Sequence, residues 1–340
     1  MPGITGVRSV VAVCALVALC VTILLIVIEN VALAAYFPHL RRVTTDFSPA
    51  YLDREVEAVK GGPAATVFLG DSVLWGYRLP PDVIAVSLLQ EQGCHCPNFA
   101  FKSGNPANDY ALMRVFVARG IRPRVVVIEV NQAVLNQADN EYQTLHPAIA
   151  ALAAPLMTPQ ERALLTMPSP PTAFERAASS LSVLYAMRSD IRETVFGDVP
   201  PPPAQPLTPD LFEGTYDLAP LTPKNVGVTF LAKTADLLRT AGIPAVAFLT
   251  PTNHRLLHDY IDNKQYRANE AYLTALLSGR GLRVVDFDRA VPTAEFLDNA
   301  HLTIAGQRRL STLLAGALSH TTSRTCRRCG PKSSRAGPPV

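Results

Sequence analysis

Residues 65–72 read ATVFLGDS. The first five are apolar or β-branched and a glycine follows directly, which is typical of a short buried strand in a parallel sheet. In open parallel sheets, ligands bind beyond the carboxyl ends of the strands. We therefore expect Ser72 to lie just past a strand end, on a sharp turn made by Gly70 and Asp71, with its hydroxyl facing the crevice.

A second motif, far along the chain, contains what a reactive serine needs. Residues 298–303 read DNAHLT, so a carboxylate precedes a histidine by three positions. A serine hydroxyl is a weak nucleophile until a base removes its proton, and a histidine oriented by a carboxylate is a common base. We predict that Ser72 is the nucleophile, His301 the base and Asp298 the orienting acid. Thr303 is predicted to cap the helix that follows, over 302–318.

Apolar segments alternate with helical patterns along the chain, as a parallel sheet with crossover helices requires. The further strand candidates are 83–86, 98–101, 125–130, 244–249 and 282–287, and the clearest helices cover 108–119 and 226–241. This order predicts an α/β fold: a three-layer α/β/α sandwich around a mainly parallel five-stranded sheet of the flavodoxin-like kind.

With these motifs the chain resembles the SGNH hydrolase superfamily, also called GDSL esterases and lipases, over roughly residues 64–318. The resemblance implies the flavodoxin-like fold, a covalent serine mechanism through Ser72, and no cofactor or metal. It also implies that the backbone N–H groups of Ser72 and Gly104 belong to an oxyanion hole, since Gly104 ends the family-like block NFAFKSG. The chain is similar in particular to membrane-anchored bacterial polysaccharide O-acyl esterases and acyltransferases.

The third block of that family is where this sequence departs from it. The family carries G-x-N-D after a strand, whereas residues 124–132 read RVVVIEVNQ, without the glycine and the aspartate. Asn131 is the nearest substitute for the family's asparagine, which is the third oxyanion donor. The alternative is an asparagine that ties down a strand end.

Other polar and aromatic residues near the motifs are candidates for substrate binding. Asn253 and His254 directly follow a candidate strand and should open onto the same crevice. A turn asparagine and a surface histidine are the alternative. Asp71 precedes the nucleophile, and Trp75 with Tyr77 follows it, where the rings would offer an apolar or sugar-stacking wall unless Trp75 packs in the core.

Segments outside the core indicate attachments to the catalytic domain. Residues 10–28 hold no charge over nineteen positions, which is long enough to cross a bilayer as a helix. We predict a transmembrane anchor or uncleaved signal at 1–36, a linker and leading helix at 37–63, an SGNH-like domain at 64–320 with an inserted helical and proline-rich cap at about 136–223, and a basic disordered tail at 321–340. A partly disordered spacer is the alternative for 198–222.

Charge and cysteine usage exclude several classes of function. The last twenty residues carry five basic and no acidic side chains, which leaves −2 on the rest of a chain whose net charge is +3. Basic and aromatic residues do not interleave, so the body is not predicted to bind nucleic acid. Nucleotide-loop and metalloprotease motifs are absent from the sequence. The thiols of Cys94, Cys96, Cys326 and Cys329 would form disulfides in an oxidising compartment, which we prefer over a zinc site.

The predicted reaction is attack of Ser72 on an ester carbonyl, a covalent acyl-enzyme, and transfer of the acyl group to water or to an acceptor hydroxyl. A single-pass tether to the cell membrane with the domain outside the cytoplasm favours an O-acetylated envelope or exported carbohydrate as substrate, or another lipid or carbohydrate ester. The competing hypothesis is a non-catalytic module that binds glycan or assists a membrane acyltransferase. A lipid esterase facing the cytoplasm is a further alternative, because Arg41 and Arg42 leave the inverted topology open.

Overall fold

The computed structural model describes residues 4–36, 49–61, 65–77, 79–135, 143–168, 172–182, 185 and 219–319. The chain divides into two compact units, one made of Met1–Ala50 and Pro170–Ala204 and the other of Tyr51–Ser169 and Gln205–Val340. Both predicted site motifs belong to the second unit. The predicted tail, the four prolines at 200–203 and residues 37–48 of the predicted linker lie outside the described residues.

The second unit is built on a parallel sheet. Its strands β1 (Thr66–Leu69), β2 (Val125–Val130), β3 (Ala245–Leu249) and β4 (Arg283–Asp286) lie side by side in chain order, and each neighbouring pair is parallel. Every residue of β2 and β3 is buried, which is why these strands are nearly continuous apolar runs. The predicted α/β class is confirmed, and the carboxyl ends of all four strands share one edge.

The prediction of five strands is wrong for the described residues, where the sheet has four. Instead, residues 83–86 span the end of a 3-10 turn, Pro81–Val83, the extended Ile84 and the start of helix α4 (Ala85–Glu91). Ala85, Val86 and Leu89 are buried at helical spacing, a pattern that four residues read alone do not distinguish from a strand.

The other predicted strand, 98–101, is reduced to a single bridge beside β1. Asn98 pairs in parallel with Phe68, and the Phe68 N–H donates to the Pro97 carbonyl at 3.0 Å. Proline has no N–H to continue such a ladder. The side-chain amide of Asn98 then donates to the Leu74 carbonyl, and its side-chain oxygen accepts the Ala100 N–H. These backbone groups therefore do not pair within a strand.

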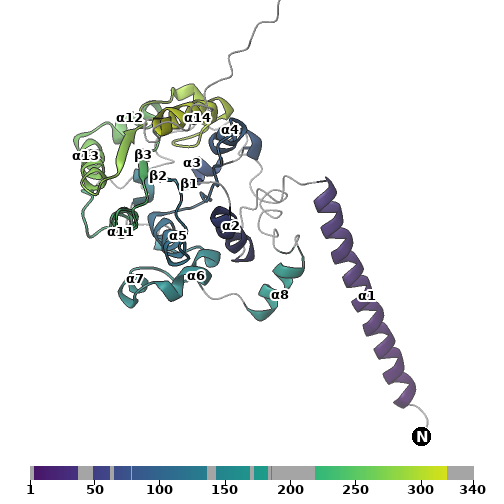
Figure 1. Ribbon diagram of the computed structural model, residues 1–340. Helices are drawn as coiled ribbons and strands as arrows, with labels where there is room; N and C mark the ends of the chain where they lie inside the picture. Colours follow the sequence, from purple (N-terminus) through teal and green to yellow (C-terminus); the bar gives the residue numbers. More distant parts are fainter. Residues whose placement is uncertain are drawn as a thin grey trace, which may run out of the picture. The chain divides into compact units, whose positions relative to one another are not determined.

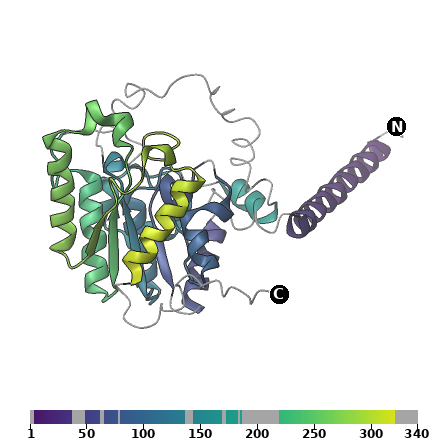
Figure 2. The same cartoon turned by 90° about the horizontal axis from the view of Figure 1, so that it is seen from above.

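Helices cover both faces of the sheet, as predicted for a three-layer sandwich. Helices α5 (Pro106–Ala118) and α11 (Val226–Thr240) lie on one face, and α4 and α14 (Ile304–Ser319) on the other (Figure 1, Figure 2). The core on the second face joins Phe68, Val127 and Val246 of the sheet to Leu89 and Leu310 of these helices. The helices expected at 108–119, 226–241 and 302–318 are thereby confirmed within a few residues.

The remaining helices of this unit are short or peripheral. They are α2 (Pro49–Gly61), α3 (Ser72–Trp75), α6 (Pro147–Ala153), α7 (Pro159–Ala163), α12 (His254–Ile261) and α13 (Lys264–Ser278), with 3-10 turns at Gln132–Leu135, Ala154–Leu156 and Thr293–Glu295. Part of the predicted insert, α6 and α7, is fastened to α5. The Tyr110 hydroxyl of α5 donates to Glu161 of α7 at 2.6 Å, and Lys233 of α11 pairs with the same carboxylate at 3.0 Å.

The first unit contains α1 (Ile4–Tyr36) and α8 (Ala173–Leu181). Many large apolar side chains of α1, such as Leu16, Leu24 and Val31, are exposed, as is Phe174 of α8. Among the residues that the structure describes, no helix combines the length and the apolar character that crossing a membrane requires. The predicted transmembrane helix is therefore not confirmed.

Candidate active site

The structure brings together the three residues predicted to form the catalytic relay. Ser72 is the first residue of α3, directly beyond β1, and its Oγ lies 2.8 Å from Nε2 of His301, which is 229 positions away in sequence. Nδ1 of His301 lies 2.7 Å from Oδ2 of Asp298. Both distances are those of hydrogen bonds, so the hydroxyl, the imidazole and the carboxylate form one continuous chain.

Asp298 is held in its loop by backbone donors as well as by the imidazole. Its Oδ1 accepts the N–H groups of Ala300 at 3.1 Å and His301 at 2.8 Å. Burial alone would raise the pKa of Asp298, but the hydrogen bonds and charge of His301 and these backbone N–H groups lower it below its usual value. The carboxyl therefore stays ionised and fixes the imidazole tautomer that leaves Nε2 free to take the serine proton.

Asn253, predicted as a substrate ligand, instead supports this loop. Its side-chain amide donates to the Asp298 carbonyl at 3.0 Å, and its backbone N–H donates to the Asn299 carbonyl at 2.9 Å. The residue is 6% exposed. On the far side of the loop, Thr303 Oγ1 accepts the N–H of Gly306 at 3.3 Å, so it caps α14 as predicted.

Asp71 is also occupied by the protein. It is the N-cap of α3: Oδ1 accepts the Val73 N–H at 2.9 Å, and Oδ2 accepts the Asn131 side-chain amide at 2.8 Å. Because it is 3% exposed and both oxygens have donors, Asp71 fixes the nucleophile turn in this structure rather than facing a ligand.

The three predicted oxyanion donors differ in whether their N–H groups already have a hydrogen-bond acceptor within the described residues. In the described part of the chain, the Ser72 N–H has no hydrogen-bond acceptor. The side-chain amide of Asn131 has one hydrogen on Asp71, while its oxygen accepts the Ala133 N–H at 3.1 Å; the second amide hydrogen has no acceptor among the described residues. The Gly104 N–H donates to the Phe101 carbonyl at 3.0 Å.

Gly104 is nevertheless required to be a glycine, for a steric reason. A Cβ at this position would collide with the Gly70 carbonyl oxygen and would lie 3.1 Å from Cα of Asp71. The second block thus packs its backbone directly against the nucleophile turn, which no larger residue would permit.

Aromatic side chains stand beside the histidine, as predicted for a wall next to the nucleophile. The ring of Tyr77 packs against the imidazole of His301, with centroids 4.4 Å apart and planes tilted by 33°. The ring centroid of Trp75 lies 6.4 Å from that of Tyr77, and Trp75 also packs against the apolar core, which is the alternative role predicted for it.

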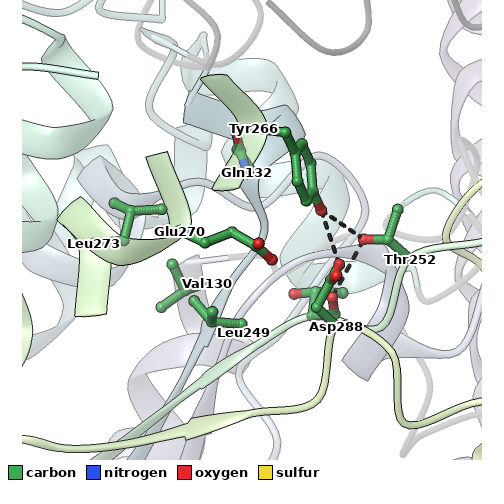
Figure 3. A pocket seen from close by; sticks show the side chains of 9 residues that line it. Val130, Gln132, Leu249, Thr252, Tyr266, Glu270, Leu273 and Asp288 are labelled. Atoms are coloured by element: carbon green, nitrogen blue, oxygen red, sulfur yellow. Dashed lines mark hydrogen bonds between the residues drawn. The ribbon is translucent and has the colours of Figure 1, made fainter. Parts of the chain in front are cut away.

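His254, the other predicted substrate ligand, belongs to an acidic cluster beyond β3 and β4. Its Nε2 pairs with Asp288 and its Nδ1 with Asp262, the latter at 3.2 Å. Asp288 also accepts the Tyr266 hydroxyl at 2.8 Å (Figure 3). The imidazole is therefore engaged by two carboxylates rather than presented to the triad.

A cavity of about 10 Å³ lies within this cluster, lined by Thr252, Tyr266, Glu270, Asp288 and neighbouring apolar side chains (Figure 3). This is room for about one water molecule. Burial and the nearby carboxylates of Asp288 and Asp286 raise the pKa of Glu270 to about 8. Within the described residues, no group of three or more His, Cys, Asp or Glu side chains is arranged to hold a metal ion.

Among the described residues, Cys94 and Cys96 form no disulfide with one another, and the two tail cysteines lie outside those residues. Sequence reasoning missed Glu129, a buried acid of β2 that contacts the nucleophile turn. An acidic residue in an otherwise aliphatic strand is the signal that would have identified it.

Comparisons with known proteins give weak likenesses. A protein-family model that carries no description matches residues 224–323. No curated protein is significantly similar in sequence. Among solved structures, the chain is similar to the carbohydrate acetylesterase Est24 from Sinorhizobium meliloti, with 9% identity, a TM-score of 0.41, and coverage of 76% of this chain and 100% of that one.

Two further solved structures are similar to a comparable degree. They are an inhibitor-bound aryl esterase from M. smegmatis, with 14% identity, a TM-score of 0.38, and coverage of 76% of this chain and 100% of that one, and the acetyl-xylooligosaccharide esterase Axe2 from Geobacillus, with 12% identity, a TM-score of 0.37, and coverage of 76% and 95%. At such scores these likenesses do not indicate the activity of this chain, which has to be inferred from its own residues.

Proposed function

We propose that this chain is a serine-dependent ester hydrolase or acyltransferase of the SGNH type. The observation that carries the proposal is the relay itself, with 2.8 Å between Ser72 Oγ and His301 Nε2 and 2.7 Å between His301 Nδ1 and Asp298 Oδ2. A hydroxyl, an imidazole and a carboxylate in this order are the minimum set for covalent acyl transfer.

The reaction proceeds in two transfers of the acyl group. Ser72 Oγ attacks the ester carbonyl carbon while His301 Nε2 accepts the hydroxyl proton, and Asp298 stabilises the resulting imidazolium. The tetrahedral intermediate collapses as the alkoxide leaves and takes the proton from His301. Water or an acceptor hydroxyl then attacks the acyl-enzyme, gives its proton to His301, and releases Ser72 with the acid or a new ester.

The developing oxyanion is stabilised first by the Ser72 N–H, which has no acceptor among the described residues. The second amide hydrogen of Asn131 is the next donor. The Gly104 N–H already donates to the Phe101 carbonyl, so it contributes to the oxyanion only through a hydrogen bond shared with that carbonyl. One preorganised donor of this kind is worth about 100-fold or more in rate.

The substrate in this proposal is an acyl ester, most simply an acetyl ester, of a cell-envelope or exported carbohydrate. Tyr77 and Trp75 beside His301 support it, since aromatic faces offer sugar rings an apolar surface. Release of acetate from an acetylated oligosaccharide, measured against p-nitrophenyl esters of increasing chain length, tests the substrate class. Preference for long acyl chains would contradict it.

The proposal also includes attachment to the cell membrane through the N-terminal segment, with the domain outside the cytoplasm. The support is the uncharged run at 10–28. Extraction of the full chain with alkaline carbonate, and protease access to a C-terminal tag in spheroplasts, would test attachment and side. Quantitative release into the soluble fraction would contradict attachment.

The experiment that tests the activity is covalent labelling of the full chain with a fluorophosphonate probe. We expect one label per chain, lost in Ser72→Ala and in His301→Ala. The exposed Ser278→Ala and His258→Ala serve as matched controls and keep the label. A folded native chain that takes no label would contradict the proposal and favour the non-catalytic glycan-binding module.

A further inference from the structure

Glu129 is an ionisable side chain in a place where such groups are rare. It occupies the fifth position of β2, whose other residues are all Val or Ile, and it is 5% exposed. Burying a carboxyl group in apolar surroundings is costly unless hydrogen bonds compensate the loss of water. Its contacts therefore indicate why it is there.

These contacts lead to the nucleophile turn. Oε2 of Glu129 accepts the backbone N–H of Asp71 at 3.0 Å and that of Leu74 at 3.4 Å. Oε1 accepts the hydroxyl of Thr250, at the end of β3, at 3.2 Å. One side chain thus connects the ends of β2 and β3 to the turn that carries Ser72.

The amides of this turn are occupied in a selective way. Residues 71 and 74 donate to Glu129, and residue 73 donates to the Asp71 carboxylate at 2.9 Å. The amide of Ser72, between them, has no acceptor in the described part of the chain. The two acidic side chains therefore hold every amide of residues 71–74 except the one that an oxyanion would need.

Gly70 and Glu129 are complementary in size. A Cβ on Gly70 would collide with Oε2 of Glu129 and would lie 2.6 Å from its Cβ. The family that this chain resembles has a glycine in its third block, at the position that Glu129 occupies here. In this chain the space opposite Gly70 is filled by a carboxyl group that reaches the turn.

The charge state of Glu129 is consistent with a fixed position. Burial, followed by the nearby Asp71 carboxylate, raises the pKa of Glu129 well above its usual value. Burial and Asp71 act in the same direction on the pKa of Asp109. A neutral Glu129 keeps its acceptor oxygens without placing a second negative charge beside Asp71.

We propose that Glu129 is a positioning residue of the reaction proposed above, on which this inference rests. By holding the amides of Asp71 and Leu74, it fixes the turn so that Ser72 presents its N–H to the oxyanion and its Oγ to His301. Glu129 does not touch the reacting atoms.

The test uses the full chain and two variants of similar size. Glu129→Gln keeps an acceptor oxygen for the two amides, whereas Glu129→Leu removes it. For each protein, urea unfolding, the rate of fluorophosphonate labelling, kcat and KM for p-nitrophenyl acetate, and hydrogen exchange of the Asp71 and Leu74 amides are measured.

We expect Glu129→Leu to lower the labelling rate and kcat by about 100-fold with little change in KM, because small displacements of a nucleophile cost about that much. Exchange of the two amides should accelerate. Glu129→Gln should label at close to the native rate and keep the amides protected. A folded Leu variant with native labelling, or a Gln variant that loses as much as Leu, would overturn the proposal.

Gly70→Ala provides a second test if the Leu variant does not fold. Its new Cβ displaces the Glu129 carboxyl while leaving the acid present, so the same loss of rate is expected and a native rate would overturn the inference. If the native chain takes no label, the proposed function fails and this inference fails with it. A labelled native chain with unaffected variants overturns only the role of Glu129.

Discussion

Tyr77 packs against the imidazole that accepts a proton during the proposed reaction, with ring centroids 4.4 Å apart. A ring face near a forming imidazolium stabilises it by about 1 kcal/mol, or roughly fivefold in rate. We expect Tyr77→Leu to label with fluorophosphonate about fivefold more slowly, while Tyr77→Phe keeps most of the rate.

The conservative variant distinguishes the ring from its hydroxyl. If Phe lost as much rate as Leu, the hydroxyl rather than the ring face would be responsible. If neither variant changed the labelling rate, the contact with His301 would have no part in the reaction.

At the scale of single residues, the sequence was informative where chemistry follows from local pattern. Ser72 after a strand, and Asp298 three residues before His301, could be predicted from the strand context and the order of the motifs, and the structure brings these side chains within hydrogen-bond distance. Asn253 and His254 share the same strand-end context, but their partners include the Asp298 carbonyl and the Asp288 carboxylate, which lie 45 and 34 positions further along the chain. Glu129 was missed because its strand reads as buried and apolar.

Helix α14 is connected to helices α3 and α4 through one side chain. Gln307, 1% exposed, accepts the Ala85 N–H through Oε1 and donates to the Val73 carbonyl through Nε2, both at 2.9 Å. Gln307→Leu would leave both backbone groups buried and unpaired, at about 1 to 3 kcal/mol each. We expect the free energy of unfolding, measured by urea titration, to fall by at least about 2 kcal/mol.

The neighbouring Arg308→Gln is the matched control, because this side chain is exposed on the same helix. Its urea midpoint should stay near that of the native chain. If Gln307→Leu kept the urea midpoint of the native chain, the two hydrogen bonds of Gln307 would contribute nothing to stability.

At the scale of elements, the long periodic helices and the aliphatic strands were predictable, because burial sets their patterns over many residues. The segment at 83–86 was not, since four apolar residues fit a strand and a helix equally well and only packing of Ala85, Val86 and Leu89 against α14 decides. The strand predicted at 98–101 is only a single bridge at Asn98, because proline and asparagine interrupt its hydrogen-bond ladder.

For the molecule as a whole, acidic groups with shifted pKa values make stability depend on pH. The pKa of Glu270 is raised from 4.5 to about 8, so the folded state binds this proton more tightly than the unfolded chain does. Its stabilising contribution is complete below about pH 4.5 and is lost as the pH rises through about 8. The lowered pKa of Asp298 acts oppositely, and its contribution is lost in acid.

We therefore expect the Tm to be highest near about pH 5 and to fall by a few degrees toward about pH 8. Glu270→Gln should flatten this slope, whereas the exposed Glu91→Gln should keep it. Thermal scans followed by circular dichroism would measure both. A Tm that rises from about pH 5 to about pH 8 would contradict a protonated Glu270 in the folded state.

Ser72 and His301 lie 229 positions apart in sequence, which has a consequence for folding kinetics. Contacts between residues so far apart form slowly, because the intervening chain must first lose much of its freedom. During refolding, helical signal should therefore appear before the serine becomes reactive. Labelling would then count only completely assembled molecules, and circular dichroism would also include the partly folded ones.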